Sequence, residues 1–411
     1  METATLTPEI AEEPPSGTTR VLAENDEPPS SVVTTDRLFA SVSPENWRDW
    51  RWQFKNRITS VEELSKHLHL PDKQQARLRL VSLKYPFAIT PYYLSLIDPA
   101  AFADPVYAQA VPAVEELVMA DEGLEDPLAE QAHSMVPGLV HRYPDRVLMV
   151  LTNVCPMLCR HCTRKREWRT GAWTRSPAEV QGMIDYVRQH PEVRDVIISG
   201  GDPLVLSTAR LETVLAKLRE IKHVEIIRLG TRCPVVLPQR IDDELCRMLG
   251  KYGPIWLNTH FNHPREVTAE AMSACDKLLR AGIPINNQAV LLKGVNDRSE
   301  TQRALCHGLL RAKVRPYYLF QCDKVQGTEH FWTPVESGIK IMEELRGFTS
   351  GLAVPTYVID LPNGGGKIPV GQNYVMAQEG DGFLVRNYQG QLSHYKNPGT
   401  VQIVYKEQVL V

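Results

Sequence analysis

The chain has 411 residues, of which 43% are hydrophobic, and this is enough for one large domain or two ordinary ones. Its formal net charge of -3 gives no broad positive field for nucleic acid or for an acidic membrane surface. No apolar run approaches the roughly 20 residues that a membrane span requires, and the first residues lack a secretory signal. We therefore expect a soluble cytoplasmic protein with no nucleic-acid partner and no membrane contact.

The N-terminal part is predicted to be a tail followed by helices. Residues 1–37 are rich in Pro, Glu, Ser and Thr, carry too little apolar surface to offset chain entropy, and are expected to be disordered. Ser43 is typical of a helix start, and Trp47 and Trp50 follow it at a helical spacing that favours core packing. We expect helices over residues 38–140.

Strands and helices alternate regularly over residues 141–370. Strands are expected over residues 146–152, 193–199, 224–229, 255–259, 283–292, 314–321 and 354–359. Helices are expected from residue 176, along the stripe 211–218, and over residues 242–251, 269–279, 300–312 and 335–345. This alternation predicts an α/β fold with parallel strands, arranged as a partial or full (β/α) barrel. Residues 371–411 carry short alternating apolar runs and are expected to form a small C-terminal β appendage.

Three of the eight cysteines crowd together directly after the first barrel strand. Cys155, Cys159 and Cys162 have the spacing C-x3-C-x2-C, which can hold three irons of a [4Fe-4S] cluster and leave the fourth iron open for S-adenosylmethionine. A zinc site completed by His161 or a distant cysteine is the alternative, but no second C-x2-C pair exists. The spacing favours the cluster, and the five scattered cysteines are expected to be buried apolar residues.

Two glycine-rich segments also follow strands. Residues 199–203 (Ser-Gly-Gly-Asp-Pro) place two glycines where a backbone can approach a ligand closely, although an ordinary turn is the alternative. Three glycines at 364–366 precede Lys367, and a phosphate-binding Walker loop would need Ser or Thr at the next position, where Ile368 stands. A lysine that binds pyridoxal phosphate as an aldimine is the other interpretation.

Charged residues near strand ends are compatible with ligand binding. Arg142, Tyr143 and Arg146 lie just before the first strand and suit a phosphate group, or else form a solvated charge cluster. Asp323 and Asp360 follow two later strands, where an acid either binds a cation or caps the surface. The residues alone leave both alternatives open.

Six segments, in their order and spacing, resemble the lysine 2,3-aminomutase family of radical S-adenosylmethionine (radical SAM) enzymes. They are His141–Arg146, Cys155–Arg164, Ser199–Pro203, Thr259–Pro264, Arg315–Asp323 and Asp360–Pro369. The resemblance runs from the helical part to about residue 400 and implies a barrel of the radical SAM type. It implies a [4Fe-4S] cluster, S-adenosylmethionine, pyridoxal 5'-phosphate and an external one-electron reductant of the flavodoxin or ferredoxin type.

The resemblance also implies roles for individual residues. Cluster ligands would be Cys155, Cys159 and Cys162, and contacts to S-adenosylmethionine would come from His161, Ser199, Gly200, Gly201 and Asp202. Pyridoxal phosphate would be held by Lys367, Arg142, Tyr143 and Arg146. Arg164 would pair with the substrate carboxylate, and Asp323 and Asp360 would bind its distal cation. The implied reaction is an isomerisation in which L-lysine becomes β-lysine by migration of the amino group from C2 to C3.

The sequence departs from the family in one respect. Well-known members carry a zinc site that includes a cysteine where this chain has Arg298, and no cysteine follows Cys322 here. We therefore expect no zinc, and a homo-oligomer remains possible without it. Leu361 and Asn363 differ from the commoner Ala and Gly of the lysine loop.

Several alternatives stay open. An arginine 2,3-aminomutase is the nearest, because a guanidinium also suits two aspartates. A relative that modifies a lysine of a translation factor is another, whereas a glutamate-specific enzyme is expected to lose the two acids. A non-catalytic zinc-binding barrel protein is the alternative from a different class.

Overall fold

The computed structural model describes residues 38–98, 103–119 and 122–399, so the predicted disorder of residues 1–37 lies outside it. The described chain begins with α2 (Pro44–Arg48), α3 (Trp50–Lys55), α4 (Val61–Leu68), α5 (Asp72–Lys84), α6 (Pro91–Leu94), α7 (Pro105–Ala110) and α8 (Glu115–Val118). The Ser43 side chain accepts from the Asn46 amide at the start of α2, as its sequence position predicts. No helix in the described ranges is long and apolar enough to cross a membrane.

Residues 134–143 form a hairpin of two strands, so the prediction of helices over residues 38–140 extends too far toward the C-terminus. β1 (Ser134–Val136) and β2 (Leu139–Tyr143) pair antiparallel around the Pro137-Gly138 turn. Gly138 has φ 82°, a conformation that glycine adopts without strain. The Pro-Gly pair is the turn signal that the helical prediction overlooked.

One ten-stranded sheet, in sequence order from β1 to β10, organises the rest of the chain. It continues with β3 (Arg146–Val150), β4 (Asp195–Ser199), β5 (Ile226–Gly230), β6 (Ile255–Thr259), β7 (Ile285–Leu291), β8 (Arg315–Gln321), β9 (Thr356–Leu361) and β10 (Gly366–Pro369). Strands β3 to β9 are parallel, and antiparallel strands flank them at both ends. No pairing joins β1 to β10 among the described strands, so the barrel is partial.

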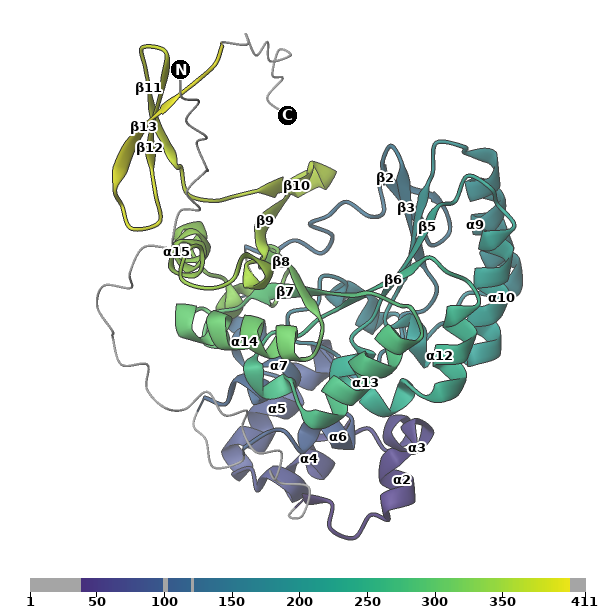
Figure 1. Cartoon of the computed structure of the whole chain (residues 1–411). Coiled ribbons are helices and arrows are strands. Elements are labelled where there is room, and N and C mark those ends of the chain that lie inside the picture. Colours follow the sequence, from purple (N-terminus) through teal and green to yellow (C-terminus); the bar gives the residue numbers. More distant parts are fainter. Residues whose placement is uncertain (1–37, 99–102, 120–121, 400–411) are drawn as a thin grey trace, which may run out of the picture. The chain divides into compact units, whose positions relative to one another are not determined.

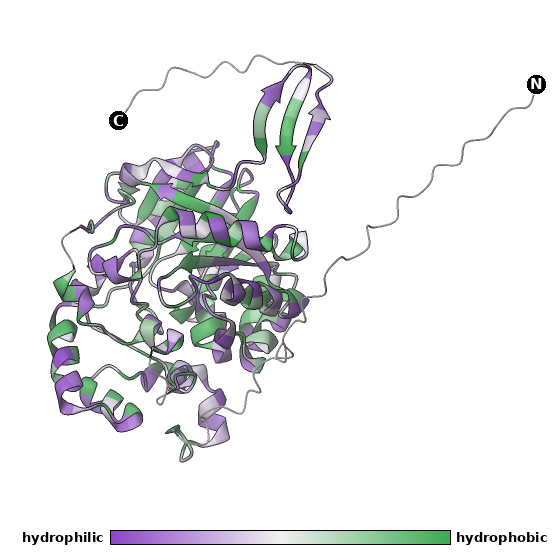
Figure 2. Ribbon diagram, turned by 90° about the vertical axis from the view of Figure 1, so that its left-hand side faces the viewer, coloured by the Kyte–Doolittle hydropathy of each residue, from purple (hydrophilic) through white to green (hydrophobic). Residues whose placement is uncertain are grey.

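The connecting helices lie along the outer side of the sheet (Figure 1). They are α9 (Pro177–Gln189), α10 (Thr208–Arg219), α12 (Asp243–Gly250), α13 (Ala269–Arg280), α14 (Ser299–Arg311) and α15 (Val335–Leu345), with the short α11 (Cys233–Val236) between β5 and β6. In Figure 2 purple and green stretches alternate along the helices, as hydrophilic and hydrophobic residues follow one another. In α10 the buried side chains Leu211, Val214, Leu215 and Leu218 recur every three or four residues. The scattered cysteines 233, 246, 275, 306 and 322 are all buried, as predicted.

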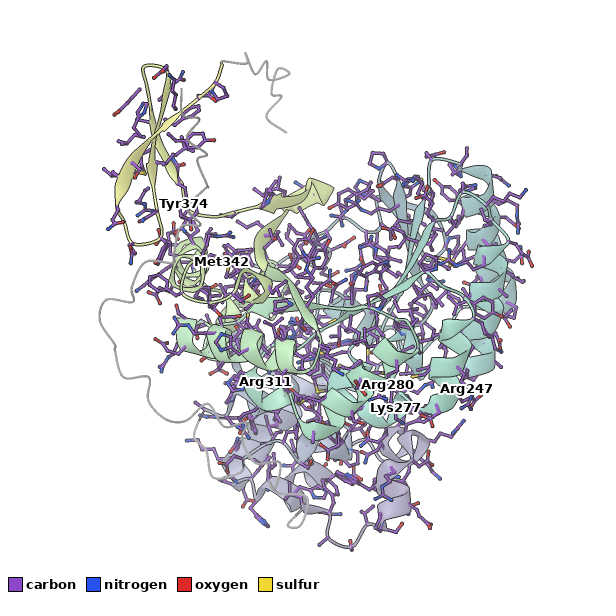
Figure 3. The ribbon with its side chains drawn as sticks, viewed as in Figure 1. Arg247, Lys277, Arg280, Arg311, Met342 and Tyr374 are labelled. Atoms are coloured by element: carbon purple, nitrogen blue, oxygen red, sulfur yellow. The ribbon has the colours of Figure 1, made fainter. Side chains whose placement is uncertain are left out.

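A surface hollow of about 370 Å³ lies between α12 and α13, where Figure 3 labels Arg247, Lys277 and Arg280. Lys277 pairs with Asp243 at 3.0 Å, and Arg280 pairs with Asp276 at 2.6 Å. None of the predicted site residues lines this hollow. Its cations are therefore ordinary surface charges of the outer helices.

The expected C-terminal β appendage is an antiparallel three-stranded sheet. It consists of β11 (Val375–Glu379), β12 (Gly382–Arg386) and β13 (Leu392–Lys396). The Arg386 guanidinium pairs with Glu343 of α15 at 2.9 Å, and the Tyr388 ring lies edge-on to Phe348. These contacts attach the small sheet to the region that follows β8.

Candidate active site

The cysteine loop follows β3 and is fixed by backbone contacts from the next strand. Gly200 has φ 145°, and a Cβ on it would overlap the Thr152 carbonyl oxygen. A Cβ on Gly201 would likewise overlap the backbone of Val154. The two glycines are thus required for close approach, but the neighbour in this structure is the cysteine loop itself. They hold the end of β4 against the start of that loop.

Replacing Gly200 with alanine is expected to misplace the cysteine loop, because both its backbone conformation and the neighbouring carbonyl reject a Cβ. We expect a loss of about 2 to 4 kcal/mol in the free energy of unfolding and less iron per chain. Gly182→Ala, in an open position of α9, is the matched control and should stabilise by about 0.5–1 kcal/mol. Urea unfolding measures the stability of the two variants, and iron analysis measures their iron content. Equal stabilities of the two variants would contradict the prediction.

The three thiols of this loop are half-buried neighbours. Burial, followed by repulsion from Cys159, raises the pKa of Cys162 to about 11, and burial with repulsion from Cys162 raises the pKa of Cys155 further. Among the described residues, no three Cys, His, Asp or Glu side chains are gathered around one point as ligands of a single metal ion, whereas three thiols that hold a cluster each bind a different iron. The soft donors fit an iron–sulfur cluster, whose positive irons would remove the mutual repulsion.

Two arginines that sequence reasoning missed contact the cysteine loop. The Arg57 Nη1 donates to the Cys155 carbonyl oxygen at 2.5 Å, and the Arg232 Nη1 donates to the Cys159 Sγ at 2.8 Å. Arg232 is buried and also pairs with Glu266 at 2.8 Å. An isolated arginine carries no local motif, so only the fold brings these charges to the loop.

A buried ion triad lies beneath the loop. The Glu116 carboxylate contacts Arg160 at 2.5 Å and Lys165 at 2.7 Å, and the three side chains are at most 1% exposed. Burial alone would raise the pKa of Glu116, but the two cations hold that pKa below its ordinary value. Burial lowers the pKa of Lys165 to about 8 despite this partner. The triad links α8 to Arg160 and Lys165, which lie on either side of Cys162 in the sequence.

His161 meets two polar residues from the end of β6. Its Nε2 lies 3.0 Å from the Nε2 of His260, and the Asn262 amide nitrogen lies 3.3 Å from the first of these atoms and 3.1 Å from the second. Burial lowers the pKa of both histidines, that of His260 to about 3, so both rings are neutral. The Nδ1 of His161 is buried without a hydrogen-bond partner in the described structure. This orphaned atom fits a polar group of a bound ligand.

Asp202 differs from its expected role. Its buried carboxylate accepts from the Leu204 amide, the Thr231 hydroxyl and the Arg232 amide. These bonds occupy the oxygens with protein donors, so Asp202 stabilises the turn after β4 in this structure. Its direct contact with S-adenosylmethionine stays a prediction.

The lysine loop is held by two hairpins from opposite ends of the sheet. In the β9–β10 hairpin Lys367 lies directly across from Asp360, and the Lys367 Nζ pairs with the Asp360 Oδ1 at 3.0 Å. In the β2–β3 hairpin Tyr143 lies across from Arg146, whose guanidinium is 4.0 Å from the tyrosine ring centroid. The Lys367 amide donates to the Tyr143 hydroxyl at 3.1 Å. Residues more than 200 positions apart are thereby brought together.

Arg142 completes this group. Its Nη1 is 3.9 Å from the Asp360 Oδ1, too far for a hydrogen bond, and is buried without a partner in the described structure. A cationic donor left unsatisfied beside Lys367 fits the phosphate of pyridoxal phosphate. Gly366 has φ 85°, a conformation that favours glycine, and it lies against the Tyr143 side chain.

Asp323, after β8, lies in the same electrostatic environment. Burial and the neighbouring Asp360 carboxylate raise the pKa of Asp323 to about 7, while Lys367 and Arg142 oppose the shift. Two carboxylates this strongly coupled disfavour a second negative charge unless a cation lies between them. The pair therefore has the electrostatic character of a cation site.

Arg164 has a partner that the sequence did not predict. Its Nε and Nη2 donate to the two oxygens of Glu130 at 3.0 and 2.6 Å, and its Nη1 donates to the Gly200 carbonyl at 3.0 Å. Burial opposes ionisation of Glu130, yet Arg164 and Arg166 lower its pKa to about 2. A single glutamate in an irregular segment gives no sequence signal.

A partial parallel barrel with a three-cysteine loop after its first parallel strand defines a radical SAM enzyme. Residues 149–304 match the family model of the radical SAM superfamily. Residues 342–408 match the model named lysine-2,3-aminomutase. The chain belongs to the lysine 2,3-aminomutase family, a family of isomerases whose radical SAM chemistry implies S-adenosylmethionine and a [4Fe-4S] cluster.

Curated relatives cover most of the chain. The L-lysine 2,3-aminomutase of Clostridium subterminale is 53% identical over 361 residues, which are 88% of this chain and 87% of that protein. The enzyme of the same name from Fusobacterium nucleatum is 50% identical over 90% of this chain and 87% of its own length. Glutamate 2,3-aminomutase of Clostridioides difficile is 45% identical over 89% of this chain and 86% of its own length. Membership of this family therefore does not by itself identify the substrate, which has to be inferred from the residues of the site.

Proposed function

We propose that this protein is an L-lysine 2,3-aminomutase that uses pyridoxal phosphate on Lys367. The observation that carries the proposal is the convergence of Lys367, Tyr143, Arg142 and Asp360 from the two ends of the sheet. The relatives named for lysine support the same assignment.

Lys367 suits covalent attachment of an aldehyde cofactor. Its side chain is 32% exposed, so a ring can reach the amine, and the unsatisfied Arg142 suits the phosphate. Pyridoxal phosphate, when bound, would supply a conjugated system that delocalises the unpaired electron during nitrogen migration, and S-adenosylmethionine at the cluster would supply a carbon radical. Cys155, Cys159 and Cys162 would hold that cluster. Ser199, Gly200 and Gly201 would face its ligand.

The charges of the site match both ends of a basic amino acid. Arg164 offers a guanidinium to the substrate carboxylate, and Asp323 with Asp360 offers negative charge to the distal cation. These residues orient the substrate and exclude water, so the protein contributes mainly position. A glutamate side chain would meet repulsion from the two acids.

Lysine binding is expected to tighten as the pH rises through about 7. Asp323 is protonated below its pKa of about 7 and carries the charge that attracts the distal ammonium only above it. The dissociation constant of lysine should fall by up to about tenfold between about pH 6 and pH 8. Asp323→Asn should bind weakly and show no such inflection in spectroscopic titrations. An unchanged inflection in that variant would assign the titration to another group.

The substrate test uses anaerobic protein reconstituted with iron, sulfide, pyridoxal phosphate and S-adenosylmethionine. Separate incubations with L-lysine, L-arginine and L-glutamate, analysed by chromatography and mass, should yield β-lysine most efficiently. β-Arginine as the main product would transfer the assignment to arginine. Turnover of glutamate alone would overturn the roles of Asp323 and Asp360. A colourless, inactive protein after reconstitution would favour the non-catalytic alternative.

The absence of zinc stays a prediction. Arg298 precedes α14 and is exposed, and the described residues after Cys322 include no cysteine. Metal analysis of the reconstituted enzyme should find iron without stoichiometric zinc. The oligomeric state, the one-electron reductant and the cytoplasmic location likewise remain expectations from the sequence.

A further inference from the structure

The segment 122–133 touches three separate parts of the site. The Leu124 amide donates to the Lys324 carbonyl after β8 at 2.8 Å. The His133 ring packs where a Cβ on Gly364 of the lysine loop would stand. Glu130 lies between these two contacts in the sequence and pairs with Arg164 and Arg166, which follow Cys162. The segment is thus fixed to the surroundings of the substrate at both ends.

The Glu130 carboxylate is shared by two arginines. Its Oε2 accepts from the Arg164 Nε at 3.0 Å and from the Arg166 Nη2 at 2.8 Å, and its Oε1 accepts from the Arg164 Nη2 at 2.6 Å. The Glu130 side chain is 9% exposed, so these charge-assisted bonds are little weakened by water. Arg166 also pairs with Asp126 at 3.3 Å and with Glu167 at 3.6 Å, whereas Glu130 is the one carboxylate in the described structure that pairs with Arg164.

The arrangement of the N–H donors of Arg164 shows how this arginine could bind a second carboxylate. A guanidinium has five N–H donors in one plane, and Glu130 takes the Nε side of Arg164 while the Gly200 carbonyl takes one donor of Nη1. Within the described structure these three bonds leave one N–H on each terminal nitrogen. The two terminal nitrogens of the guanidinium can therefore bind a second carboxylate while Glu130 stays bound along the Nε edge.

We infer that Glu130 is a positioning residue that holds Arg164 from the side and thereby presents its free end to the α-carboxylate of the substrate. The inference rests on the proposed role of Arg164 as the carboxylate-binding residue. Without Glu130 the arginine side chain would have several rotamers to lose when substrate binds. The effect is confined to ligands that carry a carboxylate.

The test compares lysine with 1,5-diaminopentane, which has both amines and no carboxylate. Binding to the reconstituted enzyme is followed by the change in the visible spectrum of the cofactor, independently of turnover. In Glu130→Gln we expect the dissociation constant of lysine to rise about tenfold, with that of the diamine unchanged. Asp126→Asn is the matched control, because Asp126 lies in the same segment and pairs with Arg166 at 3.3 Å but not with Arg164. It should bind both ligands normally.

Glu130→Asp covers the case in which Glu130→Gln does not fold, since it keeps the charge but shortens the side chain and breaks the fork. It should show the same selective weakening of lysine. Tighter lysine binding in either variant would mean that Glu130 competes with substrate, and equal weakening of both ligands would mean a general structural role; both overturn the inference. Arg164→Gln tests the proposed role of Arg164 separately from the positioning role of Glu130. If it leaves lysine affinity unchanged, the proposed role of Arg164 itself is wrong.

Discussion

Replacing Lys367 with alanine or arginine is expected to abolish the visible absorption of bound pyridoxal phosphate and to reduce aminomutase activity by at least about 10³-fold. Alanine removes both the amine and the cation that pairs with Asp360. Arginine keeps a cation beside Asp360 but does not form the covalent link. If the two variants fail alike, the covalent bond rather than the ion pair is the essential contribution.

The control for this result is Lys340→Ala, because Lys340 is an exposed lysine of α15 whose Glu344 contact is 3.8 Å. It should bind the cofactor and turn over normally. Absorption spectra recorded before and after gel filtration measure cofactor retention, and product analysis measures activity. Retention of the cofactor band by Lys367→Arg would show that a different lysine carries it.

Glu116→Gln is expected to destabilise the protein by about 3 to 5 kcal/mol, although Glu116 touches no predicted ligand. The substitution leaves Arg160 and Lys165 buried without a compensating negative charge. Because Arg160 lies between two of the cysteines, we also expect less iron per chain after reconstitution. Glu115→Gln, on the exposed side of the same short helix, should change neither quantity.

Urea unfolding and iron analysis of the two variants measure this prediction. Equal stabilities of Glu115→Gln and Glu116→Gln would show that the buried triad contributes nothing.

Local patterns were sufficient for the parts of this protein that depend on neighbours in sequence. The apolar spacing of α10 and the alternation of strands with helices follow from periodicities that each segment carries by itself. The spacing of Cys155, Cys159 and Cys162 indicates one cluster loop, because three ligands on one short segment need no distant partner. The prediction of helices up to residue 140 was wrong for the hairpin at residues 134–143. Its strands are so short that their apolar spacing cannot be distinguished from that of a helix.

The sequence by itself determined the family, the radical SAM class of chemistry and the alternation of parallel strands with helices. Only the tertiary structure decided which charges meet: Glu130 beside Arg164, Arg232 beside Cys159, and Tyr143 beside Lys367. Each pairing joins residues separated by at least one strand and its crossover, so no local periodicity records it. The curvature of the sheet sets these distances, and curvature is a property of all its strands together.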